Sequence, residues 1–193
     1  MRGDLRRKKG TRKEKRAVLV ITEGIQTEPD YFRRLSRHLK ATGVQVRPSR
    51  IKGVGRDPLS VVTEAINIRA DQQKDQEFDE AWAVVDVDDH AKLKEAIAVA
   101  KANKIGIAIS NPCFEVWLVW HFEDLTGYRT ASQLRAALKR NGVLGKALPD
   151  SFPVGAVKDA SARSSKSMTG VASHTMGPNP SSAIHELVAL LES

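Results

Sequence analysis

Residues 18–24 read VLVITEG, an apolar run that ends on a carboxylate followed by a glycine. The aliphatic segment 17–21 (AVLVI) predicts a strand that is buried on both faces, as in a parallel sheet. Glu23 then stands where this strand ends. Gly24 allows a sharp turn and leaves no side chain there, so that a phosphate group has room to approach. A turn alone would explain Glu23, so its meaning depends on what the rest of the sequence places beside it.

The remaining apolar segments alternate with segments of helical period. Strands are expected at residues 44–48 (VQVRP), 81–85 (AWAVV) and 105–110 (IGIAIS). Helices are expected from Thr27, from Asp57-Pro58, around residues 93–100 and after Asn111-Pro112, where the apolar sequence FEVWLVWHF follows. This alternation predicts one α/β domain over residues 17–193, with a mostly parallel, four-stranded sheet flanked by helices.

The C-terminal third has a different texture. A helix is expected at residues 132–140, and the terminal segment SSAIHELVALLES (181–193) predicts an amphipathic helix. Between them, residues 151–180 are rich in Ser, Gly, Pro and Ala with little periodicity. This composition predicts a mobile loop or connector.

A second acidic cluster, DVDDH at residues 86–90, follows the expected strand 81–85. In open parallel sheets, ligands bind beyond the carboxyl ends of the strands. The strand period of two sends Asp86 and Asp88 to the same side, so they converge on Glu23 if the two strands are neighbours. Crowded carboxylates repel unless a cation or a proton neutralises them, and an all-oxygen cluster suits Mg²⁺ or Mn²⁺. Asp89 has a plainer interpretation as the N-cap of the next helix.

The net charge of +8 is concentrated at the N-terminus. Residues 1–16 carry nine Lys and Arg against two acids, and this basic arm includes Arg6, Arg7, Lys8, Lys9, Arg12 and Lys13. The rest of the chain is nearly neutral. The arm is expected to be either a disordered leader or a phosphate-binding segment that adds affinity for nucleic acid without sequence choice.

Other features bear on the compartment. No apolar run approaches the roughly 20 residues that span a bilayer, so no membrane association is expected. The N-terminal residues also lack the apolar core of a signal peptide. The single cysteine, Cys113, excludes an internal disulfide. Together these features predict a cytoplasmic protein.

Further polar residues are expected near the same sheet edge. Glu115 is either another metal ligand or a first-turn acid favoured by the helix dipole. Candidate phosphate contacts are Lys52, Arg56, His90 and Asn111, in addition to Gly24. Asn111 is also a natural helix cap. Residues expected to belong to the core are Trp117, Trp120 and His121 on the apolar helix.

The pairing of Glu-Gly after a first strand with Asp-x-Asp after a later strand resembles the Toprim domain. This Rossmann-like fold is shared by topoisomerases, bacterial primases, recombination proteins and OLD-family nucleases. Nearly the whole chain resembles the RloB family of bacterial defence-associated proteins. The resemblance implies a Toprim-like sheet flanked by helices, followed by extra C-terminal helices. The segments that carry the resemblance are the basic leader, VLVITEGIQTEPDYF, GRDPLSVV, AWAVVDVDDH, ISNPCFEVWLVWHF and NPSSAIHELV.

By position, the Toprim glutamate falls on Glu23 and the Asp-x-Asp pair on Asp86 and Asp88. The resemblance implies that these residues bind Mg²⁺, with Glu23 as a general acid or base in phosphoryl transfer. Asp89 extends the pair, and the family motif includes Glu115. The resemblance also implies an ABC- or AAA-type ATPase partner encoded nearby, as in two-component abortive-infection systems.

The leading hypothesis is therefore a metal-dependent nuclease of the Toprim type, acting on DNA or RNA in anti-phage defence. An alternative is a non-catalytic regulatory subunit that binds nucleic acid and the ATPase, with FEVWLVWHF and the C-terminal helix as its docking face. A nucleotidyl transferase also stays open. The sequence has no G-x-x-x-x-G-K-[ST] motif, which argues against NTP hydrolysis by this chain. Self-association stays open as well.

Overall fold

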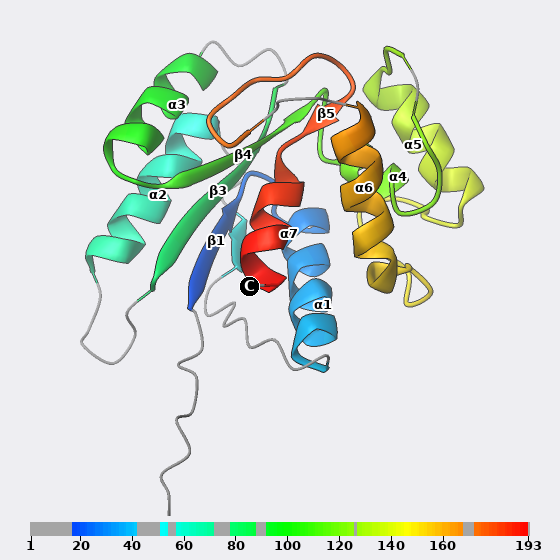
Figure 1. Ribbon diagram of the computed structural model, residues 1–193, viewed down its shortest axis with the longest axis horizontal. Helices are drawn as coiled ribbons and strands as arrows, with labels where there is room; N and C mark the ends of the chain where they lie inside the picture. Colours follow the sequence, from blue (N-terminus) through cyan, green and yellow to red (C-terminus); the bar gives the residue numbers. More distant parts are fainter. Residues whose placement is uncertain are drawn as a thin grey trace, which may run out of the picture.

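The computed structural model describes residues 17–41, 51–53, 57–71, 78–87, 92–125, 127–167 and 172–192. Within these residues, a five-stranded sheet of order β2-β1-β3-β4-β5 lies between two layers of helices (Figure 1). In chain order the elements are β1 (Val18–Thr22), α1 (Thr27–Ala41), β2 (Ile51–Gly53), α2 (Pro58–Ala70), β3 (Glu80–Asp86), α3 (Leu93–Ala102), β4 (Gly106–Asn111), α4 (Glu115–Val119), α5 (Ala131–Arg140), η1 (Val154–Ala156), α6 (Val157–Ser167), β5 (Ser181–Ser182) and α7 (Ile184–Glu192).

The sheet is parallel except at one edge. β1 pairs in parallel with β2 on one side and β3 on the other, and β3 pairs in parallel with β4. Only β5 is antiparallel, where Ser182 lies opposite Ser110. The expected mixed α/β architecture with a mostly parallel sheet is therefore confirmed. The first strand is a neighbour of the strand that ends at Asp86, which is the condition under which the sequence places Asp86 near Glu23.

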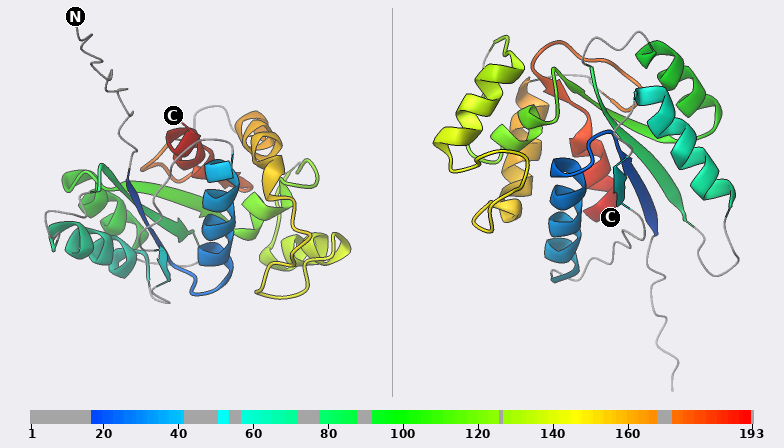
Figure 2. Two further views of the ribbon diagram at one scale, coloured as in Figure 1. Left: turned by 90° about the horizontal axis from the view of Figure 1, so that it is seen from below. Right: turned by 180° about the vertical axis from the view of Figure 1, so that it is seen from behind.

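Alternate residues of the strands face opposite helix layers, as the pleat of a strand requires. Leu19 and Ile21 of β1 pack with α2 and α3 on one face. Val18 and Val20 contribute to the larger core on the other face, which is covered by α1, α4, α6 and α7 (Figure 2). Because both faces are covered, the strands are continuously apolar rather than alternating.

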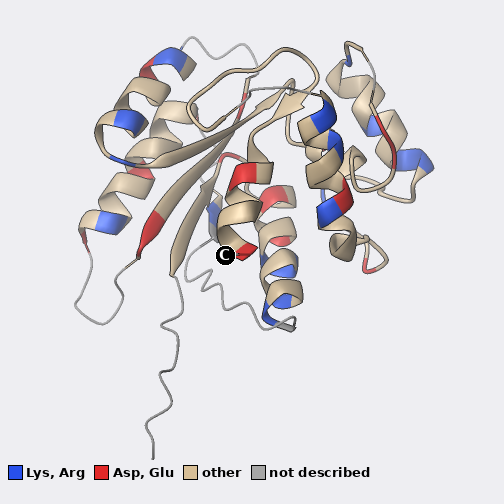
Figure 3. Cartoon of the chain, in the orientation of Figure 1, with Lys and Arg blue, Asp and Glu red and all other residues tan. Residues whose placement is uncertain are grey.

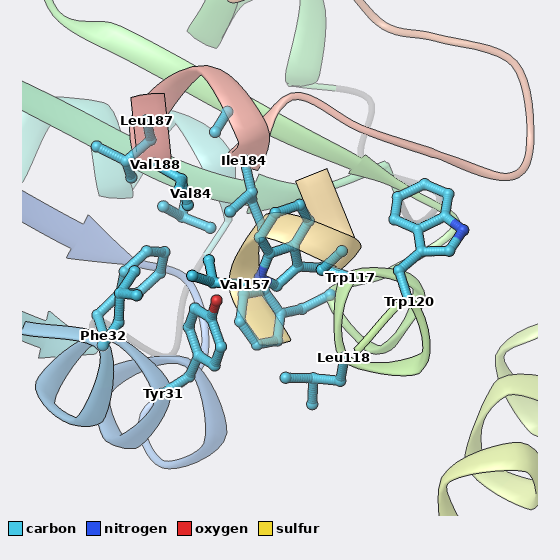
Figure 4. Packing of buried hydrophobic residues seen from close by; sticks show 14 of the residues in the cluster. Tyr31, Phe32, Val84, Trp117, Leu118, Trp120, Val157, Ile184, Leu187 and Val188 are labelled. Carbon is cyan, nitrogen blue, oxygen red and sulfur yellow. The ribbon is translucent and has the colours of Figure 1, made fainter. Parts of the chain in front are cut away.

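The larger core is rich in aromatic side chains from α1 and α4 (Figure 4). Trp117 and Trp120 are fully buried there, and His121 is only 4% exposed. These three were expected to be core residues, which is confirmed. The same burial contradicts the docking face expected on FEVWLVWHF, because its large side chains are already packed inside the chain. The apolar face of α7 is used in the same way, through Ile184 and Leu187.

Three further expectations differ from the structure. The sheet has a fifth strand, β5, and its second strand in the chain is β2, at residues where no strand was expected. The strand expected at residues 44–48 lies outside the described residues. The loop expected over residues 151–180 is wrong where η1 and α6 form, because small residues spaced along α6 (Val157, Ala160 and Ser164) bury its inner face. Among the described residues, no helix has both the length and the apolar character needed to cross a membrane.

Candidate active site

Glu23 directly follows β1, and the backbone holds it against β3. Its amide donates to the carbonyl oxygen of Val84 at 3.0 Å, which extends the ladder between the two strands by one residue. Its carboxylate oxygen Oε2 accepts from the backbone amide of Asp86 at 3.3 Å. Because β1 and β3 are neighbours in the sheet, the two acids that the sequence separates by more than sixty positions lie at one point of its carboxyl edge.

Asp86 is the last residue of β3, and its direction follows from the strand period. Val84 belongs to the core on the α1 and α4 side, whereas Val85 belongs to the core on the α2 and α3 side. Val87 packs against that second core as well. Asp86 therefore faces the α1 and α4 side, where it lines a small pocket of about 180 Å³ together with Glu28 and Glu115.

Glu115 reaches this pocket from the first turn of α4. A cis peptide bond joins Asn111 to Pro112 just beyond β4, and α4 begins three residues later. The buried thiol of Cys113 lies close enough to Glu115 and Asp86 to be affected by their charge. Burial raises the pKa of this thiol, and the negative charges of Glu115 and Asp86 raise it further. Glu115 and Asp86 thus act electrostatically on one buried position.

Glu28 is a member of the site that the sequence did not reveal. It lies in the first turn of α1, and its Oε1 accepts from the backbone amide of Gly24 at 3.0 Å. Burial is the main cause that raises the pKa of Glu28, and the charges of Glu115 and Glu23 add to the effect. An acid in a first helical turn is ordinarily explained by the helix dipole, so its pattern gave no sign of a site.

Gly24 has a packing role that the sequence did not indicate. A Cβ at this position would collide with the carboxylate of Glu28. Gly53 of β2 is constrained in a similar way, because a Cβ there would strike the backbone of Gly24 and Ile25. The absence of a side chain at Gly24 therefore makes room for Glu28, and the turn that carries Glu23 packs tightly between β2 and α1.

Two of the expected phosphate contacts are engaged elsewhere in the chain. The ammonium group of Lys52 lies 2.8 Å from the carboxylate of Glu64 on α2. The side-chain amide of Asn111 donates to the carbonyl oxygen of Gly177 at 2.8 Å. Asn111 does not cap α4 either, since the N-cap residue of that helix is Phe114. Some of the predicted site residues lie outside the described part of the chain: the basic arm (residues 1–16), Arg56, Asp88, Asp89 and His90.

The described acids alone do not form a complete metal cage. Within the described ranges, no group of three or more His, Cys, Asp or Glu side chains is arranged to hold a metal ion. The donor chemistry nevertheless suits Mg²⁺, which is commonly bound through one or two carboxylates and keeps several waters. Glu23 and Asp86 offer two such carboxylates.

Comparison with models of protein families gives a match over most of the chain. The sequence model of a family described as RloB-like protein matches residues 18–191. No curated protein and no solved structure matches the chain. The matched region includes β1, Glu23, Asp86 and Glu115, and it extends into α7. Because the match covers almost the entire sequence, the chain belongs to the RloB-like family.

Proposed function

We propose that this protein is a metal-dependent nuclease that hydrolyses phosphodiester bonds in DNA or RNA. The observation that carries the proposal is the convergence of Glu23 and Asp86 at the carboxyl edge of neighbouring parallel strands. Ligand sites of open α/β sheets lie at this edge. Glu28 and Glu115 line the same small pocket as Asp86, so that three carboxyl groups meet beside this edge.

In this proposal Glu23 and Asp86 hold the metal ion, with Glu115 beside them and Asp88 and Asp89 following in the chain. A bound Mg²⁺ or Mn²⁺ polarises a phosphate and lowers the pKa of an attacking water. Glu28 positions the turn that carries Glu23, through its hydrogen bond to the amide of Gly24. Lys146 lines the acidic pocket and supplies positive charge near a bound phosphate.

The biological setting is also a proposal. Family membership supports a role in anti-phage defence beside an ATPase partner, with the Toprim-type site as the effector. The apolar side chains of FEVWLVWHF are buried inside the chain, so they give no support to the docking face expected for a non-catalytic subunit. In this proposal the nearly neutral residues 17–193 carry the acidic site. The basic arm (residues 1–16) adds affinity for nucleic acid.

A cleavage assay tests the proposal. Labelled single- and double-stranded DNA and RNA are incubated with the protein and Mg²⁺, Mn²⁺ or chelator, alone and with the ATPase encoded nearby. Cleavage is expected with metal only. Glu23→Gln and Asp86→Asn are expected to reduce the rate at least about 100-fold, since each removes a charged ligand from the metal.

The matched control is Glu80→Gln. It removes a carboxylate from the first residue of β3, at the end of this strand opposite to Asp86. This variant is expected to cleave like the wild type. Cleavage that survives in both Glu23→Gln and Asp86→Asn would refute the assigned roles. Incorporation of labelled nucleotides instead of cleavage would point to a nucleotidyl transferase.

A further inference from the structure

A second, larger pocket of about 460 Å³ adjoins the acidic pocket. It lies among the first turns of α1 and α4, the helix α5 and the loop at residues 143–146 that follows α5. Its inner wall is apolar and is formed by the buried side chains of Leu118, Leu138 and Val143. The side chain of Leu144 stands at its edge and is 72% exposed. The pocket thus combines an apolar inner wall with one exposed apolar side chain at its edge.

The two pockets share a boundary. Thr27, Glu115 and Lys146 line both of them. A ligand in the larger pocket would therefore lie directly beside Asp86 and Glu28, which line only the smaller one. One extended ligand could therefore occupy the larger pocket and reach the acidic pocket at the same time.

Three cations line the larger pocket: Arg135 and Lys139 on α5, and Lys146 in the loop. Within the described part of the chain, none of the three forms an ion pair or donates a side-chain hydrogen bond. Other cations of this region are occupied, since Arg140 pairs with Glu123 and Arg163 pairs with Asp124. Figure 3 shows the contrast between the basic positions on α5 and the acidic first turn of α1. The charge around the pocket is suited to an anion.

The loop that forms one wall of the larger pocket is fixed by hydrogen bonds from α1. The hydroxyl of Thr27 donates to the carbonyl oxygen of Lys146 at 2.7 Å. Further along, the guanidinium of Arg34 donates to the carbonyl oxygens of Leu148 and Pro149 at 2.6 and 2.7 Å. Gly145 has a φ of +105°, which lets the loop turn where other residues would be strained. These contacts tie the loop to α1, so a ligand meets a pocket that is already formed.

We propose that this pocket binds an unstacked base of a single-stranded nucleic acid, beside the phosphate that the acidic site acts on. The inference rests on the proposed function and adds its substrate class. The buried leucines and valine receive the apolar faces of the base, while Arg135, Lys139 and Lys146 contact the adjoining phosphates. A base within a duplex is stacked and paired, so it cannot enter such a pocket unless it is first extruded.

Binding without catalysis tests the inference. The full chain is titrated in chelator against a short fluorescent oligonucleotide, as single-stranded DNA, as single-stranded RNA and as the matching duplexes, with anisotropy as the readout. At least one single strand is expected to bind about tenfold more tightly than its duplex, because only an unpaired base can contribute its contacts with the pocket. An oligonucleotide with abasic spacers is expected to lose this advantage, and Leu144→Ser is expected to reduce it.

Charge variants give a second readout. The double variant Arg135→Ala, Lys139→Ala is expected to reduce the slope of log K against log salt by roughly 1.4, because each phosphate contact to a single strand contributes about 0.7. The matched control is Lys94→Ala, Lys101→Ala, which removes the same charge from exposed positions of α3 on the other side of the sheet. Its slope is expected to match the wild type. Circular dichroism checks that each variant is folded.

Equal binding of single strands and duplexes would overturn the inference, and so would an equal loss of slope in both double variants. Failure of the proposed function is separable from this result. Selective binding of single strands in chelator, with no cleavage when metal is added, would refute the nuclease and leave the base pocket standing. Metal-dependent cleavage with no preference in binding between single strands and duplexes would support the nuclease and refute the base pocket.

Discussion

Glu28 and Gly24 depend on each other at the first turn of the site. The carboxylate of Glu28 occupies the space that a side chain at position 24 would need, and it accepts the hydrogen bond of the amide of Gly24. The turn that presents Glu23 to the edge of β3 is thereby held from both sides. Its geometry follows from a contact between two residues, rather than from the flexibility of a glycine.

This contact predicts a coupled effect of two substitutions. Gly24→Ala is expected to destabilise the protein by about 1 kcal/mol, because the added methyl group displaces the carboxylate at the end of the Glu28 side chain from its hydrogen bond. The cost is expected to be much smaller when Glu28→Ala is already present, because the opposing carboxylate is gone. Urea unfolding of the wild type, both single variants and the double variant measures the coupling. Strictly additive changes in the free energy of unfolding would show that the two residues do not compete for space.

Among the single residues of the candidate site, some could be predicted from the sequence and others could not. Glu23 and Asp86 stand out because each ends an apolar run, and the parallel pairing of their strands brings them together. Glu28 does not stand out, because a first-turn acid is common in helices without any site. The engagement of Lys52 with Glu64 and of Asn111 with Gly177 also depends on tertiary neighbours that no local pattern indicates.

Between elements, α1 and α4 meet through a buried polar pair inside an apolar core. The hydroxyl of Tyr31 lies 3.3 Å from Nε2 of His121, and Nδ1 of His121 lies 3.1 Å from the carbonyl oxygen of Trp117. A neutral imidazole satisfies both contacts, with Nδ1 donating to the carbonyl and Nε2 accepting from the hydroxyl. Both contacts suit an uncharged His121, and its burial in the core requires the uncharged form near neutral pH.

This requirement predicts how stability depends on pH. Burial lowers the pKa of His121 from its usual 6.5 to about 4; the carbonyl of Trp117 and the charge of Asp159 favour protonation, and the charge of Arg163 opposes it. Above pH 6.5 the group is neutral in the folded and the unfolded chain. As the pH falls from 6.5 towards 4, only the unfolded chain takes up the proton, so stability is lost. Between pH 7 and pH 5 the loss is about 2 kcal/mol.

The contribution of His121 is isolated by comparison with His121→Gln, which does not titrate. The free energy of unfolding is measured by urea at pH 7, 6 and 5 for both proteins. The variant is expected to lose about 2 kcal/mol less over this range. Parallel pH profiles for the two proteins would mean that His121 takes up its proton in the folded state as readily as in the unfolded chain.

The elements also show where sequence patterns carry information. β1, β3 and β4 are apolar runs buried on both faces, so their places were evident. α6 was not, because its inner face is made of Val157, Ala160 and Ser164 in a Ser-rich segment of low hydropathy. β5 is two serines long, and its pairing with β4 depends on contacts such as that between the hydroxyls of Ser110 and Ser182. Neither element has a local pattern strong enough to predict it.

At the scale of the whole molecule, the two sides of the sheet differ. The α2 and α3 side is built mainly from aliphatic residues and alanine. The other side carries the aromatic core, and the acidic pocket and the larger cationic pocket adjoin at its edge. The charged groups at this edge are of opposite sign and lie side by side, as a site that binds both a metal ion and a nucleic-acid chain requires.

The metal site is the central claim, and it is tested without any knowledge of the substrate by measuring Mn²⁺ binding to the full chain through the electron paramagnetic resonance of free Mn²⁺. The wild type and Glu80→Gln are expected to bind the ion equally. Glu23→Gln and Asp86→Asn are each expected to weaken this binding about tenfold or more, since each removes one charged oxygen ligand. Equal Mn²⁺ binding by the wild type and by both of these variants would contradict a metal site between β1 and β3.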